Sequence, residues 1–328
     1  MPFFSIVIPV YNRPGELRDL LLSLSLQTSR DFEVLVVEDG SSLTCDQVVE
    51  AFKEKIPLRY FFKPNTGQSD SRNYGMRRAA GRYFVLLDSD CILPRDYFES
   101  LYTALSSHPL DCFGGADAAL PDFSIFQKAV NYSMTSFLTT GGIRGSKRSL
   151  ESFKPRSFNM GFSRTVFEKT GGFSDLHVGE DIDLSLRIGA AGFSIGFIPE
   201  AFVYHRRKLG YSSFFRQVFR FGQARVVLSR LHKGSLKVVH TLPAFFILGV
   251  LLILGLMGFS SVLWGIPFAG YFLLLFTDAL FKTCSIRVAA CVLPVSFIQL
   301  AGYGLGFWKS VFTRSGSTPD PRKNMYKI

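Results

Sequence analysis

The first half of the chain alternates short apolar runs with helical repeats. Four β-rich apolar runs, each suited to a strand buried on both faces, lie at residues 4–10, 32–37, 58–62 and 83–87. Leu17, Leu20 and Leu24 recur at helical spacing after Pro14, and residues 72–80 also have a helical pattern. Strands that alternate with helices are typical of parallel α/β units. The pattern predicts an α/β domain whose sheet is mostly parallel and flanked by helices.

The last third of the chain is dominated by apolar stretches without charge. No Asp, Glu, Lys or Arg lies between Lys237 and Asp278, a gap of about 40 residues, whereas one membrane span needs roughly 20. The Gly-Phe-Ser-Ser sequence at residues 258–261 predicts a tight turn that divides this stretch into two spans. Residues 288–308 form a third candidate span. The sequence therefore predicts an integral, multi-pass membrane protein.

A basic, Phe-rich segment at residues 211–232 precedes these stretches. At about 100° per residue, Arg216, Arg220, Gln223 and Arg230 share one stripe, while phenylalanines and valines lie largely across from it. An amphipathic helix of this kind suits the bilayer interface, and packing on the preceding domain is the alternative.

These patterns divide the chain into four segments: a domain at 1–210, an interfacial helix at 211–237, two or three transmembrane helices at 238–310, and a basic tail at 311–328. Positive residues before the first span and between the second and third predict that the domain is cytoplasmic. Three full spans would place the basic tail on the opposite side. Either the rule is overridden there, or one apolar segment lies in the interface or re-enters.

The formal charge of +11 is compatible with nucleic acid or with an anionic membrane. Much of the excess lies beside the apolar segments, which favours lipid headgroups and argues against nucleic acid as a partner. The five cysteines are scattered and form no CxxC motif, so the sequence predicts neither a disulfide framework nor a zinc site.

Polar clusters follow three of the predicted strands, at Tyr11-Asn12, Glu38-Asp39 and Asp88-Ser89-Asp90. In open α/β sheets, ligands bind beyond the carboxyl ends of the strands. Asp88 and Asp90 offer two carboxylates at i, i+2 to Mg²⁺ or Mn²⁺, ions that neutralise a diphosphate leaving group. Taken alone, such a pair is more often a solvated turn or a helix cap.

Further carboxylates have candidate roles in the same chemistry. Asp181, beside Glu180 in an acidic helix start, is the best candidate for a base that removes a proton from an attacking hydroxyl. Asp39, at a strand end, is suited to accept a hydrogen bond from a nucleobase N–H. Alone, each has a simpler interpretation, as an exposed helix start or a turn. The order of the motifs along the chain favours the functional interpretation.

In this order the motifs resemble those of the family 2 glycosyltransferases, whose catalytic domain has the GT-A fold. The matching blocks, with Ser71 in place of the usual Ala, lie at residues 5–12, 36–42, 65–75, 86–90, 159–164, 171–173 and 179–184. They cover roughly residues 4–205. The resemblance implies a GT-A domain that uses a nucleoside-diphosphate sugar as donor and a divalent cation, Mg²⁺ or Mn²⁺, as cofactor.

The resemblance also assigns roles to individual residues. Those implied to bind the nucleotide sugar are Pro9, Tyr11, Asp39, Arg72, Asp88, Ser89 and Asp90. Asp90 and Asp88 are implied metal ligands, and His205 lies where some GT-A enzymes place a metal ligand or a diphosphate contact, although a lone histidine is more often structural. Asp181, with Glu180 beside it, is implied to be the base of an inverting displacement.

Gln217 and Arg220 belong to a segment that echoes the QxxRW signature of processive polysaccharide synthases, with Phe221 in place of the tryptophan that stacks on the acceptor. Processive members also tend to have spans on both sides of the catalytic domain, whereas the spans predicted here all follow it. The sequence therefore favours transfer of a single sugar to a lipid-linked or membrane-proximal acceptor, as in cell-surface polysaccharide or glycolipid synthesis.

Three alternatives remain open. A processive synthase is one, and a polyprenyl-phosphate sugar synthase is another, with Arg206-Arg207-Lys208 or the arginines at 216 and 220 suited to a phosphate acceptor. The third, from a different class, is a degenerate nucleotide-binding scaffold of a membrane complex. A scaffold predicts loss of the DxD pair or of the candidate base, and both are present.

Overall fold

The structure is a computed structural model that describes residues 1–120, 122–143, 152–206 and 210–313. The chain forms two compact units. The first unit contains Met1–Ala118 and Phe153–Arg206, and the second contains Ala119–Ser152 and Arg207–Thr318. The described residues of the segment 119–143 thus belong with the C-terminal helices rather than with the sheet domain that surrounds them in sequence.

The first unit is built on a seven-stranded sheet with the order β3-β2-β1-β4-β8-β6-β9. Its strands are β1 (Phe4–Val10), β2 (Phe32–Asp39), β3 (Leu58–Lys63), β4 (Tyr83–Leu87), β6 (Cys112–Gly114), β8 (Asn159–Ser163) and β9 (Ile195–Phe197). β1 is parallel to β2 and β4, and β2 is parallel to β3. β8 is antiparallel to both β4 and β6. The mostly parallel sheet predicted from the sequence is confirmed.

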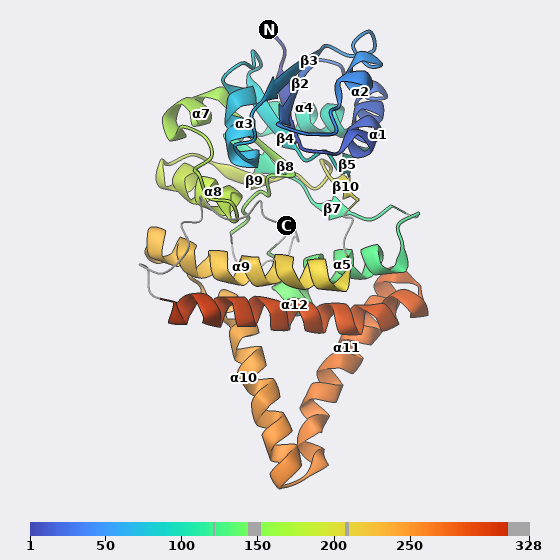
Figure 1. The fold of residues 1–328 in the computed structure, drawn as a ribbon, viewed down its shortest axis with the longest axis vertical. Coiled ribbons are helices and arrows are strands. Elements are labelled where there is room, and N and C mark those ends of the chain that lie inside the picture. The colour runs from blue at the N-terminus through green and yellow to red at the C-terminus, as the bar shows by residue number, and fades with distance from the viewer. Residues whose placement is uncertain (121, 144–151, 207–209, 314–328) are drawn as a thin grey trace. The chain divides into compact units, whose positions relative to one another are not determined.

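Helices cover both faces of this sheet, because successive strand residues point to opposite sides. On one face, Ile6 and Ile8 pack against α1 (Pro14–Ser25), α2 (Asp46–Glu50) and α4 (Tyr97–Ser107). On the other face, Val7 packs with α3 (Gln68–Met76), α7 (Arg164–Thr170) and α8 (Glu180–Ala190). The layers are visible in the upper part of Figure 1.

A small second sheet positions part of the site. Its strands β5 (Cys91–Ile92), β10 (Val203–His205) and β7 (Asp117–Ala118) have the order β5-β10-β7. β10 is antiparallel to β5, with His205 opposite Cys91. This pairing places the end of the DxD segment beside a histidine that is more than 100 residues away in sequence.

The helix predicted at residues 72–80 was placed too late in the sequence. It begins at Gln68 and ends at Met76, after Gly67 with φ +99°. The backbone N–H groups of Thr66 and Gly67 both donate to Asp39, at 2.9 Å each. A contact with another strand therefore sets the start of this helix, which local helical spacing does not reveal.

The second unit is helical. Its elements are α5 (Ile125–Thr135), α6 (Phe137–Thr140), α9 (Tyr211–Leu231), α10 (Val238–Phe259), the 3₁₀ helix η1 (Val262–Gly265), α11 (Ile266–Thr283) and α12 (Ile286–Phe312). The stretches Val238–Phe259, Val262–Thr283 and Ile286–Phe312 are long and apolar enough to cross a membrane. The predicted turn at residues 258–261 separates the first two of them. Most of the predicted basic tail lies outside the described residues.

Candidate active site

The site lies where β1, β2 and β4 end, together with the start of α8. Asp39, the last residue of β2, is almost fully buried. Its Oδ1 accepts from Lys63 Nζ at 2.5 Å and from the Thr66 N–H, and its Oδ2 accepts from the Gly67 N–H. Asp39 therefore fixes the loop between β3 and α3 at the carboxyl ends of the parallel strands. The sequence analysis did not identify Lys63 as its partner.

Arg72 connects the DxD segment to the start of α8. Its side chain is fully buried, Nη2 donates to Asp88 Oδ1 at 2.7 Å, and Nη1 donates to Glu180 Oε1 at 3.2 Å. The guanidinium also lies 5.3 Å from the ring centre of Phe173. Burial lowers the pKa of Arg72, but the Asp88 and Glu180 carboxylates outweigh it and raise that pKa. Arg72 therefore holds a fixed positive charge between the two carboxylates.

Glu180 and Asp181 have different environments although they are adjacent. Glu180 is buried and also accepts from Gln68 Nε2 at 3.1 Å and Ser157 Oγ at 3.3 Å. Burial raises the pKa of Glu180 to about 7; the Asp181 charge adds to the rise, and Arg72 opposes it. Glu180 is therefore a buried carboxylate whose Oε1 has three hydrogen-bond donors, Arg72, Gln68 and Ser157.

Asp181 keeps one carboxylate oxygen available. Its Oδ1 accepts from the Ile182 backbone N–H at 2.7 Å. Its Oδ2 lies 3.8 Å from Arg156 Nη1, within ion-pair range but beyond a hydrogen bond. Among the described residues, this oxygen accepts no hydrogen bond. Of the two acidic residues predicted at this helix start, Asp181 is the less buried, with 14% of its side chain exposed against 6% for Glu180.

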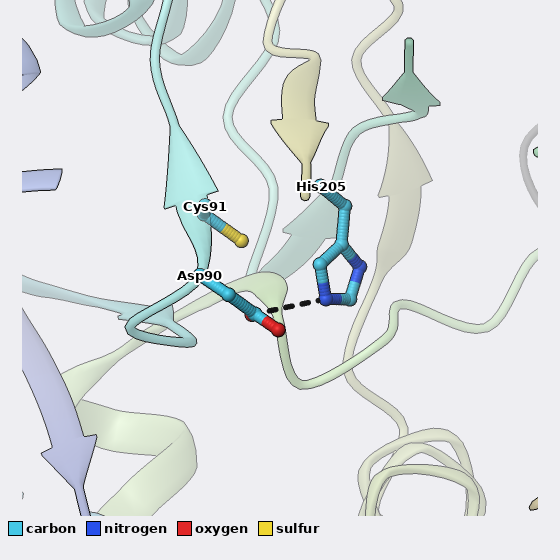
Figure 2. A group of neighbouring side chains, drawn as sticks. All are labelled: Asp90, Cys91 and His205. Carbon is cyan, nitrogen blue, oxygen red and sulfur yellow. Dashed lines mark ion pairs between the residues drawn. The ribbon is translucent and has the colours of Figure 1, made fainter. Parts of the chain in front are cut away.

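Asp90 lies between two cationic or potentially cationic side chains. Arg13 Nη1 is 3.2 Å from Asp90 Oδ2, and His205 Nε2 is 3.1 Å from Asp90 Oδ1. Figure 2 shows the Asp90 and His205 side chains directed toward one another, with Cys91 beside them. The structure thus brings His205 to the DxD segment, and it adds Arg13, which the sequence analysis missed although it follows the first strand.

Asp90, Cys91 and His205 form a cluster that could hold a metal ion. One ligand atom from each lies within 4.8 Å of the others. The Cys91 side chain is fully buried, and its Sγ lies 3.5 Å from the Phe158 carbonyl oxygen. Asp90 and His205 retain some exposure. The carboxylate and the imidazole are therefore the accessible ligands. An oxygen–nitrogen pair suits Mn²⁺ better than Mg²⁺, because Mg²⁺ prefers oxygen ligands only.

Asn73 and Gly172 fasten the later motif block to α3. Asn73 Oδ1 accepts from the Phe173 N–H at 2.9 Å, and Nδ2 donates to the Phe173 carbonyl at 2.8 Å. Gly172 has φ +79°, and a Cβ there would lie 2.4 Å from Asn73 Oδ1. Asn73 in one motif and Gly172 in the other therefore serve the same contact between α3 and the later block.

The remaining predicted residues are less tightly organised. Pro9 is partly buried near the end of β1, Tyr11 is exposed, and Ser89 is buried between the two aspartates. Gln217 and Arg220 lie on α9 in the second unit. Within the basic run at 206–208, only Arg206 is described, with Nη1 3.4 Å from Asp19 Oδ2.

The fold and the ordered carboxylates define a GT-A domain. The sequence profile described as "Glycosyl transferase family 2" matches residues 5–170, and the chain belongs to this family. Glycosyltransferase AglE of Haloferax volcanii is 25% identical over 257 residues, which cover 76% of this chain and 82% of that protein. An uncharacterized glycosyltransferase of Rickettsia felis is 37% identical over 95 residues, and the chain spans only 16% of its length.

Solved structures share the fold at low sequence identity. Mannosyltransferase PcManGT from Pyrobaculum calidifontis, in complex with GDP-Man and Mn²⁺, has a TM-score of 0.59 at 17% identity over 95% of this chain and 87% of that one. TarS 1–349 of S. aureus, in complex with UDP-GlcNAc, has a TM-score of 0.52 at 18% identity over 95% and 92%.

Proposed function

We propose that this protein is an inverting glycosyltransferase that moves one sugar from a nucleoside-diphosphate sugar to a lipid-linked or membrane-proximal acceptor. The observation that carries the proposal is the Arg72 fork, which joins Asp88 of the DxD segment to Glu180, the neighbour of the candidate base. A donor site and a base held in one rigid cluster are what a displacement at an anomeric carbon requires. The scaffold alternative predicts loss of the DxD pair or of the candidate base.

Asp90 and His205 would hold the divalent cation, and Asp88, which is predicted as a further ligand, lies outside this cluster and pairs with Arg72. The donor set fits Mn²⁺, and a structural neighbour of the same fold was solved with Mn²⁺ and GDP-Man. When bound, the ion would supply positive charge to the diphosphate leaving group. Arg13, which is half-exposed and contacts Asp90, is placed to add a second positive charge beside that diphosphate.

The protein's own residues supply the rest of the chemistry. Asp181 Oδ2 would accept the proton of the acceptor hydroxyl as that oxygen attacks the anomeric carbon. Arg72 and Glu180 position Asp181 through the first turn of α8. Asp39 and the loop it fixes, with Pro9 and Tyr11, would line the nucleoside.

The acceptor and the cytoplasmic orientation are inferred from the second unit. Its apolar helices are long enough to hold the protein in a membrane, where lipid-linked acceptors reside. The positive residues that flank these helices favour the cytoplasmic side for the first unit.

Donor turnover tests the proposal. Purified full-length protein would be assayed for hydrolysis and binding across a panel of nucleotide sugars with Mn²⁺ or Mg²⁺, beside Asp90→Asn, Asp181→Asn and an EDTA control. Asp96→Asn, an exposed aspartate near the DxD segment, is the matched control and should keep full activity. We expect metal-dependent use of one donor and a loss of about 10²–10⁴-fold in Asp181→Asn. If no nucleotide sugar is bound or turned over, the scaffold alternative replaces this proposal.

A further inference from the structure

The three candidate spans of the second unit differ in how they are packed. In the most apolar stretch of α10 only 6% of residues are buried, and in that of η1–α11 only 11%. In α12 the figure is 56%. Hydropathy alone treats these helices as equivalent, but only α10 and η1–α11 leave nearly all of their apolar surface for lipid.

α12 is bound along much of its length to α9. A Cβ on Gly302 would lie 2.6 Å from Val218 Cγ2, and a Cβ on Gly306 would lie 1.9 Å from the carbonyl oxygen of Phe219. Further along both helices, Arg230 Nη2 donates to the Ser310 carbonyl at 2.8 Å. The two helices therefore run side by side with their backbones in contact, as Figure 1 shows.

This contact constrains where α12 can lie in a membrane. α9 carries four arginines, at positions 216, 220, 225 and 230. A crossing α12 would carry α9 into the hydrocarbon with it, where each arginine is strongly disfavoured. An α12 that lies along the membrane surface keeps all four near water and headgroups.

α5 and α12 also share a buried polar contact. Ser133 Oγ donates to Gln299 Oε1 at 2.7 Å, and Ser296 Oγ lies 3.2 Å from Ser133 Oγ. α5 is a short helix with Gln127, Lys128 and Asn131 in its sequence, and it is unsuited to hydrocarbon. A second polar helix therefore accompanies α12.

α10 and α11 have the opposite character. α10 contacts α12 near its own start, where a Cβ on Gly304 would lie 2.3 Å from the Pro243 carbonyl and Trp308 Nε1 donates to the Ala244 carbonyl at 3.0 Å. α11 approaches at its far end, where Leu275 and Ala279 share a core with Val292. Away from these two contacts, α10 and α11 diverge from α12 and meet at the turn before η1, as Figure 1 shows.

We infer that, of the described helices, only the α10–α11 hairpin enters the bilayer, while α12 lies in the membrane plane with α9 and α5. Beyond its contact with α12 at Ala244, α10 continues to Phe259, which is about 22 Å of helix and reaches most of the way across a hydrocarbon core of about 30 Å. The exposed face of α12, with Ile286, Phe297, Leu305 and Phe312, rests on lipid. This arrangement is independent of the proposed sugar transfer.

The inference also accounts for the charge pattern. With α12 in the plane, Lys237 before the hairpin, Lys282 in the last turn of α11, Arg287 in the first turn of α12 and Lys309 in its last turn all lie on one side. α12 then also ends on this side, so the positive-inside rule no longer conflicts with the basic sequence that follows it. The hairpin turn at residues 259–264 has no charged residue to move across.

Cysteine accessibility in sealed vesicles tests this topology. Full-length protein would be labelled with a membrane-impermeant maleimide in right-side-out and inside-out vesicles. Reporters are native Cys284, which is exposed between α11 and α12, and, each in a Cys284→Ser background, Phe312→Cys at the end of α12 and Ser260→Cys at the hairpin turn. We expect positions 284 and 312 to be labelled from the same side, and position 260 from the other side or from neither. Labelling of 284 and 312 from opposite sides would overturn the inference.

Depth measurement gives an independent readout that does not depend on vesicle orientation. A fluorophore placed through Phe297→Cys, midway along α12, should be quenched by shallow lipid-borne quenchers. The matched variant Leu252→Cys, midway along exposed α10, should be quenched by deep ones. Equal, deep quenching at both positions would show that α12 crosses the bilayer.

Discussion

Replacing Arg72 with methionine removes the positive charge that joins two carboxylates. Methionine is similar in length and apolar, so the main effect is that buried Glu180 loses its counter-charge. Asp88 is affected less, because its side chain is 30% exposed and keeps water as a partner. The change therefore isolates the electrostatic contribution of the fork.

The expected loss of stability depends on pH. Removing one partner of a buried ion pair costs about 3–5 kcal/mol. Glu180 can relieve part of this by taking up a proton, since its pKa is already raised to about 7 when Arg72 is present. The penalty should be about 3 kcal/mol or more at pH 8 and smaller at pH 6. For a unit of this size, about 3 kcal/mol lowers the Tm by roughly 6–12 °C.

Thermal unfolding of the detergent-purified full-length protein at both pH values measures this loss. Arg77→Met, at the end of the same helix, is the matched control, because Arg77 is 52% exposed and lies 3.7 Å from Asp70. An exposed pair of this kind contributes about 0–1 kcal/mol. Adding Glu180→Gln to the Arg72 variant should restore part of the Tm. A loss no larger than that of the control, or identical at both pH values, would refute the reasoning.

Three further predictions concern the same unit. Gly172→Ala should lower the Tm more than Gly171→Ala. Both glycines have positive φ, where an alanine costs about 1–2 kcal/mol of stability, but only a Cβ on Gly172 would overlap a neighbouring side chain. Glu180 retains its proton in the folded state between its ordinary pKa of 4.5 and about 7, so stability should fall as pH rises through this range, and Glu180→Gln should flatten that slope in a pH series of melting curves. In a Mn²⁺ titration of activity, His205→Ala should raise the half-maximal concentration about tenfold or more, whereas Cys91→Ser should leave it unchanged.

Much of the fold was predictable because its signals are local. The strands at 4–10 and 83–87 were placed at their observed bounds, since buried parallel strands have continuous apolar runs. The position of the DxD pair was also predictable, because it comes immediately after the end of β4. The Arg72 fork could not be derived in this way, because its partners lie 16 and 108 residues away. Arg13 and Arg156 were missed for the same reason.

The packing of α12 against α9 could not be predicted from the sequence for a different reason. An apolar residue has the same hydropathy whether it faces lipid or another helix, so the stretch at 288–308 looked like a span. Its glycines at 302 and 306 distinguish it, since they allow α9 to approach closely. That signal acquires a meaning only once the partner helix is known.

The interleaving of the two units has a consequence for synthesis of the protein. α5 leaves the ribosome early, but its polar partner Gln299 follows Ser133 by 166 residues. At translation rates of about 5–20 residues per second, this delay lasts roughly 10–30 s. The last strand of the first unit, β10, ends at His205, so that unit can close before α12 exists. During the interval α9, whose Phe214 and Val218 share a core with Val130 of α5, is a partner of α5 that is already synthesised, and the apolar surface of α5 that later faces α12 stays open to the membrane surface or a chaperone.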